Sequence, residues 1–195
     1  IHREVPNVEL EVFVHGALCV SYSGVCYASQ HCFQRSANRG ECAQFCRMKF
    51  DLLDADGQLI EHDRYLLSMK DLCQIDHFDE LVARRPDAYR RASFGTVAYQ
   101  FEPSLRKTFN RGFTHYFLHG RGPDIASFDT PKALGEYVGT VKEVRRQSFN
   151  VAGTASFANG DGLCFLTDGR TLEGFRVNRA VGNRLYPFKM PQGLK

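Results

Sequence analysis

Residues 9–29 read ELEVFVHGALCVSYSGVCYAS, and the interpretation of the whole chain depends on them. Residues 8–15 alternate apolar and polar side chains, which is the period of a β-strand. The run ends at Gly16, Cys19 follows three residues later, and Cys26 lies seven residues beyond Cys19. The pattern predicts a strand over residues 8–15 that leads directly into a loop with two thiols.

Seven cysteines occur in the chain, and five of them lie between positions 19 and 46. An odd count without a visible signal peptide is not typical of a secreted disulfide framework. Clustered cysteines in a reducing compartment more often bind zinc or an iron–sulfur cluster. Cys42 and Cys46 have the C-x2–4-C spacing of zinc sites, whereas we interpret Cys32 and Cys164 as small core residues. The sequence therefore predicts a cytoplasmic protein whose clustered thiols hold a metal centre.

The overall composition indicates a soluble globular protein. The chain is 43% hydrophobic and 24% charged, and its net charge of +3 does not by itself require a nucleic-acid partner. No apolar run approaches the roughly 18–20 residues that cross a membrane, so we expect no membrane partner.

Local signals predict three elements after the first cysteines. Residues 36–47 contain turn formers and predict a loop that enters a short helix. Residues 48–68 predict a hairpin, because two apolar runs flank an Asp-Gly pair. Residues 68–85 predict a helix that begins at Ser68 and places Cys73 near its start.

The second half of the chain is rich in β signals. Residues 94–104 predict a strand, and residues 134–195 predict a small all-β barrel, because five short β-like runs alternate with glycine turns. We interpret Phe149, Phe157, Phe165 and Phe175 as the core of the barrel. The predicted strands lie within residues 135–144, 148–155, 162–167, 171–177 and 183–188.

Three ordered motifs resemble those of peptidase family U32. They are E-x-F-x-x-G-A-L-C-x4-G-x-C-x-x-S from Glu11 to Ser29, RSANRGECAQFCR from Arg35 to Arg47, and SMKDLC from Ser68 to Cys73. The resemblance covers roughly residues 9–82. The β-rich tail is most similar to that of the family branch that hydroxylates cytidine in large-subunit ribosomal RNA.

The resemblance implies an α/β fold with three regions. Residues 1–93 would form part of a (β/α) barrel that carries the cysteine cluster, residues 94–133 a β-rich connection, and residues 134–195 the small all-β barrel. After residue 83 the chain continues with RRPDAYRRASFG, where the family has a glycine-led strand. We therefore expect a fragment or an internally shortened member.

The resemblance also implies a [4Fe–4S] cluster, with zinc as the alternative metal. Its ligands would be Cys19, Cys26, Cys42 and Cys73, with Cys46 as an alternative ligand. The implied function is 5-hydroxylation of a pyrimidine base in rRNA or tRNA, with RNA as the partner. Two alternatives stay open, namely a collagenase-like peptidase and a non-catalytic, metal-stabilised RNA-binding module.

Two further groups of side chains are candidates for function. Glu11 and His15 would share one strand face beside Cys19, where His15 could act as a base, orient a substrate or be structural. Arginines in loops can contact RNA phosphates, although a solvated basic face is the competing interpretation. The candidate RNA-binding residues are Arg39, Arg47, Arg145, Arg146, Arg176 and Arg179.

Overall fold

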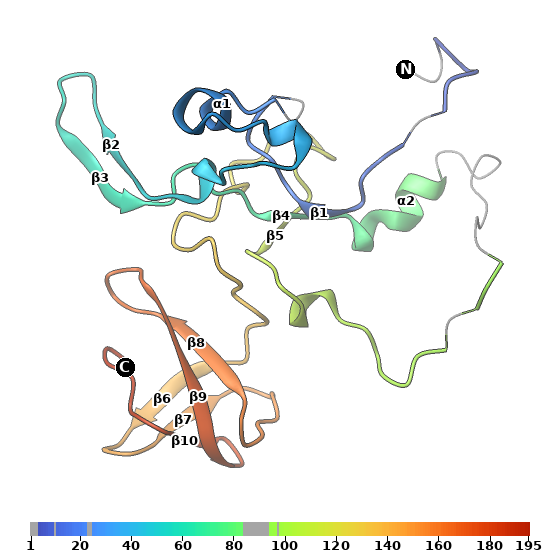
Figure 1. The fold of residues 1–195 in the computed structure, drawn as a ribbon. Helices are drawn as coiled ribbons and strands as arrows, with labels where there is room; N and C mark the ends of the chain where they lie inside the picture. Colours follow the sequence, from blue (N-terminus) through green and yellow to red (C-terminus); the bar gives the residue numbers. More distant parts are fainter. Residues whose placement is uncertain (1–3, 10, 23–24, 84–93, 97) are drawn as a thin grey trace.

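The computed structural model describes residues 4–9, 11–22, 25–83, 94–96 and 98–195 (Figure 1). Within these ranges the fold is mixed α/β, with short helices and three sheets. The first part of the chain contains a three-stranded sheet, a hairpin and the cysteine-bearing loops. The last part, orange to red in Figure 1, is a five-stranded sheet.

The three-stranded sheet joins segments that are distant in sequence. Its order is β1 (His15–Ala17), β4 (Asp71–Cys73) and β5 (Phe113–Thr114). β1 runs antiparallel to β4, whereas β4 runs parallel to β5. A (β/α) barrel has parallel strands throughout, so the described residues show a mixed α/β fold and do not confirm the predicted partial barrel.

The strand predicted over residues 8–15 is wrong, apart from its last residue. Residues 8, 9 and 11–14 have no strand structure, and Leu10 lies outside the described ranges. A run of alternating side chains forms a strand only where a neighbouring strand bonds its backbone N–H and C=O groups. Pairing with β4 begins at His15.

The hairpin predicted over residues 48–68 is confirmed. β2 (Phe50–Leu53) pairs antiparallel with β3 (Leu59–Arg64). Asp54 Oδ1 accepts hydrogen bonds from the backbone N–H groups two and four residues on, at 2.9 and 2.8 Å. Gly57 has φ of 79°, a left-handed conformation that glycine adopts without a steric penalty.

The helix predicted over residues 68–85 is only partly confirmed. Helical structure is limited to the 3-10 helix Ile75–His77 and to α2 (Phe78–Ala83), and residues 84–85 lie outside the description. Cys73 belongs to strand β4, because its segment pairs with β1. The strand predicted over residues 94–104 is wrong, since the described residues of that range form none.

Short helices hold the cysteine-bearing segments, as predicted for residues 36–47. α1 (Tyr27–Phe33) is followed by the 3-10 helices Ala37–Arg39 and Phe45–Arg47. Another 3-10 turn, Leu105–Lys107, precedes β5.

All five strands predicted after residue 134 are confirmed. They are β6 (Thr140–Val144), β7 (Phe149–Ala152), β8 (Gly162–Leu166), β9 (Leu172–Val181) and β10 (Arg184–Pro187). Their order is β6-β7-β10-β9-β8, every pair is antiparallel, and β6 and β8 are at the two ends.

One apolar core supports this five-stranded sheet. Its fully buried members include Phe149, Val177 and Leu185, and the predicted core residues Phe157 and Phe175 pack against them. The aromatic rings of Phe149 and Phe175 meet edge to face, with centroids 5.6 Å apart.

Shortening Val177 to alanine is expected to destabilise the five-stranded sheet by about 2–3 kcal/mol. The change removes two buried methyl groups and leaves a cavity in the core. Urea unfolding followed by circular dichroism measures the effect. The matched control is Val181→Ala on the same strand, where the side chain is 58% exposed and the expected change is within about 0.5 kcal/mol. An equal loss of unfolding free energy in Val177→Ala and Val181→Ala would contradict the assignment of Val177 to the core.

Candidate metal centre and RNA site

Buried Ser29 joins the segments of two cysteines. Its backbone N–H donates to Cys26 Sγ at 3.3 Å, and its hydroxyl accepts from the N–H of Ala43 at 3.2 Å. Ala43 directly follows Cys42, so α1 and the Cys42 loop are fastened to each other. The hydrogen bonds from Ser29 also lower the pKa of the Cys26 thiol, which favours the thiolate that binds metal.

Arg47 joins the segments of the two other nearby cysteines. Its guanidinium donates from Nη2 to the carbonyl of Leu18 at 3.1 Å, and from Nη1 to Ser68 Oγ and the Met69 carbonyl, both at 2.9 Å. Leu18 precedes Cys19, and Arg47 follows Cys46. These bonds give Arg47 a role in positioning the cysteine loops, and its contact with RNA stays a prediction.

The thiol of Cys46 lies among the other thiols. Burial is the main cause that raises its pKa, and the charge of Arg47 opposes that rise. Nearby thiolates raise it further, namely those of Cys19, Cys42 and Cys26. Cys46 is thus within electrostatic range of Cys19, Cys26 and Cys42, and all seven cysteines of the chain are free thiols.

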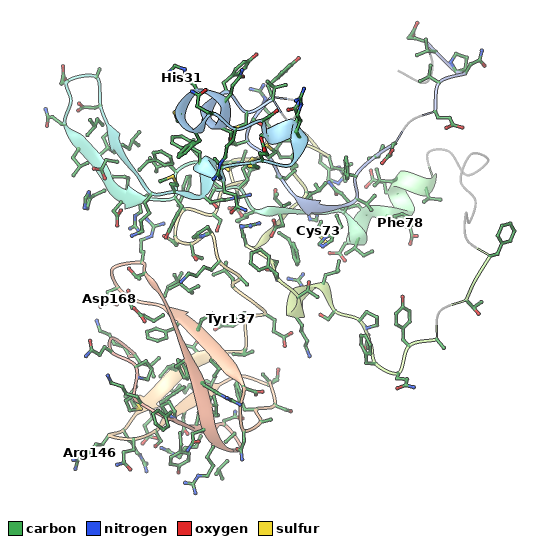
Figure 2. All side chains as sticks on the ribbon, in the orientation of Figure 1. His31, Cys73, Phe78, Tyr137, Arg146 and Asp168 are labelled. Carbon is green, nitrogen blue, oxygen red and sulfur yellow. The ribbon has the colours of Figure 1, made fainter. Side chains whose placement is uncertain are left out.

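Cys73 has a different environment from these four. It lies on β4 (Figure 2), where it is buried opposite His15 of β1, and its carbonyl oxygen is 3.0 Å from His115 Nδ1. Arg47 joins the Cys46 segment both to Leu18, which precedes Cys19, and to Ser68 and Met69, which lead into β4 and Cys73. These hydrogen bonds therefore do not separate Cys46 from Cys73. Soft sulfur donors fit an iron–sulfur cluster, and the electrostatic influence of Cys19, Cys26 and Cys42 on Cys46 makes Cys46 a candidate for the fourth ligand beside Cys73.

A pocket of about 450 Å³ opens beside Cys19. Two tyrosines line it, exposed Tyr22 and also Tyr116, whose ring stacks on Phe117 with centroids 3.9 Å apart. Tyr116 has φ of 51°, an uncommon conformation that often marks functional sites. Aromatic rings beside a pocket of this size can stack on a nucleobase. Sequence reasoning missed this pocket because its walls are distant in the chain.

The candidate catalytic residues are not brought onto one strand face. His15 is exposed on β1, and its ring meets Phe113 edge to face at 5.9 Å. Glu11 is exposed and lies outside any strand. The predicted shared face is therefore wrong, because the strand does not extend back to Glu11.

The candidate RNA-binding arginines of the five-stranded sheet lie in different settings. Arg146 is exposed in the β6–β7 turn (Figure 2), and the neighbouring Arg145 pairs with Glu143 at 2.8 Å. On β9, Arg179 stacks over the ring of Tyr186 at 4.2 Å. Arg176 borders a hollow that exposed Phe188 also lines, and Arg39 is exposed at the end of its 3-10 helix.

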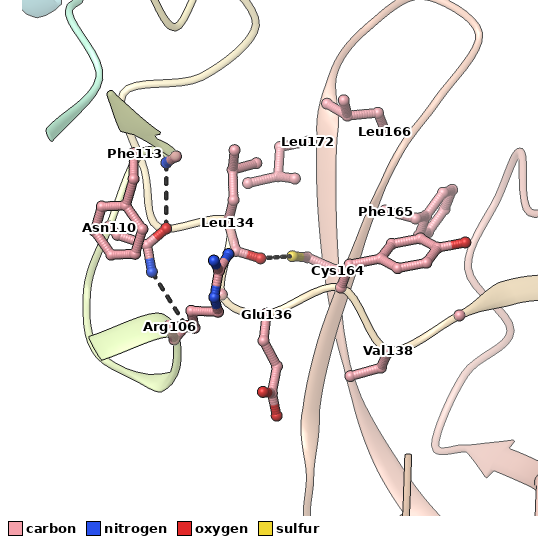
Figure 3. A pocket seen from close by; sticks show the side chains of 14 residues that line it. Arg106, Asn110, Phe113, Leu134, Glu136, Val138, Cys164, Phe165, Leu166 and Leu172 are labelled. Carbon is pink, nitrogen blue, oxygen red and sulfur yellow. Dashed lines mark hydrogen bonds between the residues drawn. The ribbon is translucent and has the colours of Figure 1, made fainter. Parts of the chain in front are cut away.

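A second pocket, of about 540 Å³, lies between the segment before β5 and strands β8 and β9 (Figure 3). Buried Asn110 shapes one wall, with hydrogen bonds to the carbonyl of Arg106 and the N–H of Gly112. Cys164 is exposed as a residue, but its thiol donates to the Leu134 carbonyl at 3.6 Å, and burial raises its pKa. Cys32 is exposed on α1, so the interpretation of these two cysteines as core residues is wrong.

Residues 1–90 match the model of Peptidase family U32. The first 90 of the 195 residues thus match this family, as the three ordered motifs indicated. One relative of the chain, the 23S rRNA 5-hydroxycytidine C2501 synthase of Escherichia coli (strain K12), is 38% identical over 98% of the chain and 35% of its own length. That match extends over 231 positions, whereas the chain has 195 residues, so the relative carries residues that the chain lacks.

Two other relatives are named as a tRNA hydroxylation protein and as a collagenase. The tRNA hydroxylation protein P1 of Bacillus subtilis (strain 168) is 35% identical over 45% of the chain and 22% of its own length. A collagenase of Porphyromonas gingivalis (strain ATCC BAA-308 / W83) is 33% identical over 58% of the chain and 34% of its own length. The chain therefore spans about a third or less of these relatives. No solved structure matches it, and none of the described helices has the length and apolar character to cross a membrane.

Proposed function

We propose that the chain is the cluster-bearing part of an iron–sulfur-dependent enzyme that hydroxylates C5 of a pyrimidine base in ribosomal or transfer RNA. The observation that carries the proposal is the match of almost the whole chain to a relative named as a 23S rRNA 5-hydroxycytidine synthase. The free thiols of Cys19, Cys26 and Cys42, which act electrostatically on that of Cys46, support it from the structural side. We also retain, as part of the proposal, that residues 1–93 correspond to a portion of a (β/α) barrel.

The residues that would hold the [4Fe–4S] cluster are Cys19, Cys26 and Cys42, with Cys46 or Cys73 as the fourth ligand. A bound cluster would supply electron transfer to the site. The protein contributes position and charge: the Ser29 N–H favours the thiolate of Cys26, and hydrogen bonds of Ser29 and Arg47 join the loops that carry the cysteines.

RNA binding is divided between two surfaces in this proposal. The pocket beside Cys19 receives the target base between Tyr22 and Tyr116, where ring stacking holds the base and limits its contact with water. Arginines of the five-stranded sheet bind the phosphate backbone. The target base then lies next to the cluster ligand Cys19, while the five-stranded sheet holds the RNA phosphate backbone.

Metal analysis of protein purified without oxygen tests the proposal. About four irons and four acid-labile sulfides per chain, with a visible absorption band that reductant bleaches, are expected. Removal of the cluster should abolish both the absorption band and the formation of 5-hydroxycytidine on an rRNA fragment. Mass spectrometry of the fragment measures the modified base. Zinc without sulfide would instead favour a non-catalytic RNA-binding module.

A collagenase-like peptidase is the second candidate, because one relative carries that name. A gelatin digestion assay before and after removal of iron separates the two activities. Digestion that persists without iron and sulfide, together with unmodified RNA, would replace the hydroxylase proposal.

Replacing Arg146 with alanine is expected to weaken RNA binding at every sequence tested. The magnitude of the slope of log affinity against log salt should fall by about 0.7–0.9, the value of one phosphate contact. Titration of labelled rRNA fragments at several salt concentrations gives the slope. Lys195→Ala is the control, because that exposed lysine already pairs with Asp168. An unchanged slope for Arg146→Ala would exclude a phosphate contact there.

A further inference from the structure

Two histidines and a glutamate meet at one end of the three-stranded sheet. His77 ends the 3-10 helix before α2, Glu80 lies in the first turn of α2, and His119 lies in the segment after β5. Glu80 Oε2 is 3.6 Å from His77 Nδ1 and 3.7 Å from His119 Nε2. Among the described residues these three form a group whose potential ligand atoms all lie within 4.8 Å of one another.

The spacing of these atoms is close to that of a metal site. With metal–nitrogen and metal–oxygen distances of about 2.0–2.2 Å, two ligands of a tetrahedral ion lie about 3.4 Å apart. The separations of 3.6 and 3.7 Å require closure of only a few tenths of an ångström. The rings of His77 and His119 already meet edge to face, with centroids 4.9 Å apart.

The surrounding residues hold this arrangement in place. His115 packs edge to face against His77 at 4.4 Å, and its Nδ1 contacts the Cys73 carbonyl at 3.0 Å. The side chain of Gln74, which is buried, donates to the His115 carbonyl at 2.7 Å. The segment that carries His119 is thus fastened to the end of β4 through His115, which lies near the start of that segment. The ligand atoms therefore need little reorganisation to bind an ion.

We propose that His77, Glu80 and His119 form a binding site for one divalent transition-metal ion, separate from the cysteine centre. Two imidazoles and a carboxylate suit Zn²⁺ or Fe²⁺, whereas the cysteine centre offers only sulfur. Three protein ligands leave a coordination position for water or for an oxygen of a substrate. The ion would also join α2 to the segment after β5.

Cobalt binding to the full chain tests this site. Co²⁺ bound by imidazole and carboxylate absorbs weakly in the visible range, whereas cobalt–thiolate bonds add strong near-ultraviolet bands, so the spectrum separates the two centres. Wild-type protein should bind one more Co²⁺ or Zn²⁺ per chain than the His77→Gln/His119→Gln variant. The single variant His119→Gln should weaken binding at this site at least 10-fold, the lower range of what even an outer-shell partner contributes.

The matched control is His62→Gln on the hairpin, an exposed histidine that pairs with Asp51 and should bind metal as wild type does. Should the double variant fail to fold, as judged by circular dichroism, His119→Gln decides alone, because that side chain is 54% exposed. Equal cobalt stoichiometry and affinity in wild type and a folded variant would overturn the proposal. This test does not depend on the cysteine centre. A protein without iron that still shows the cobalt spectrum of imidazole and carboxylate ligands would count only against the proposed hydroxylase.

Discussion

Replacing Asp71 with alanine is expected to destabilise the first part of the chain by about 3–5 kcal/mol, because the change leaves a buried charge without its partner. The Asp71 side chain is 7% exposed and that of Arg111 is 14% exposed. Asp71 Oδ1 accepts from Arg111 Nη1 at 2.8 Å, and Oδ2 accepts from the backbone N–H of Arg111 at 2.9 Å. Arg111 Nε also donates to the carbonyl of Pro131 at 2.9 Å, so the ion pair connects β4, the segment before β5 and the chain beyond. Urea unfolding followed by circular dichroism measures the loss.

Two further variants define what the loss means. Asp124→Ala removes an 81% exposed carboxylate that pairs with Lys70, and its expected cost is at most about 1 kcal/mol. The double variant Asp71→Ala/Arg111→Met should recover part of the stability, since it removes the unpaired cation as well. A cost at Asp71 no greater than that at Asp124 would contradict the buried ion pair.

The elements that sequence predicted correctly are those determined by local chemistry. The hairpin β2–β3 follows from its Asp-Gly turn, and the five strands after residue 134 follow from short apolar runs between glycine turns. In the pairs β2–β3, β6–β7, β8–β9 and β9–β10 the neighbouring strand is close in sequence, so turn and pattern specify the pairing together. Only the pairing of β7 with β10 in this sheet joins distant segments. The apolar residues predicted for the core of the last sheet, such as Phe149, were found there for the same reason.

The elements that sequence predicted wrongly depend on distant partners. Asp71–Cys73 lies in a run with helical spacing of apolar residues, yet it is a strand because β1 and β5 pair with it from 42 to 58 residues away. The same distant contacts place Cys73 inside a sheet. The pocket between Tyr22 and Tyr116 and the group of His77, Glu80 and His119 likewise combine segments that no local pattern relates.

Iron and sulfide are expected to fall to near zero in Cys46→Ala and to stay at the wild-type level in Cys73→Ala. This prediction rests on the proposed cluster and on the electrostatic influence of the neighbouring thiols on Cys46. A lost ligand exposes an iron of the cluster to solvent and to oxygen, whereas a lost thiol within β4 removes only packing. Iron and acid-labile sulfide per chain, measured after anaerobic reconstitution, give the comparison.

Stability must be separated from ligation in this comparison, because Cys73 is buried and its truncation leaves a small cavity. Cys73→Ala is therefore compared with Cys73→Val, which refills the volume without a sulfur. Cys32→Ala is the exposed control that should keep its iron. Iron retained in Cys46→Ala but lost in both folded Cys73 variants would make Cys73 the fourth ligand.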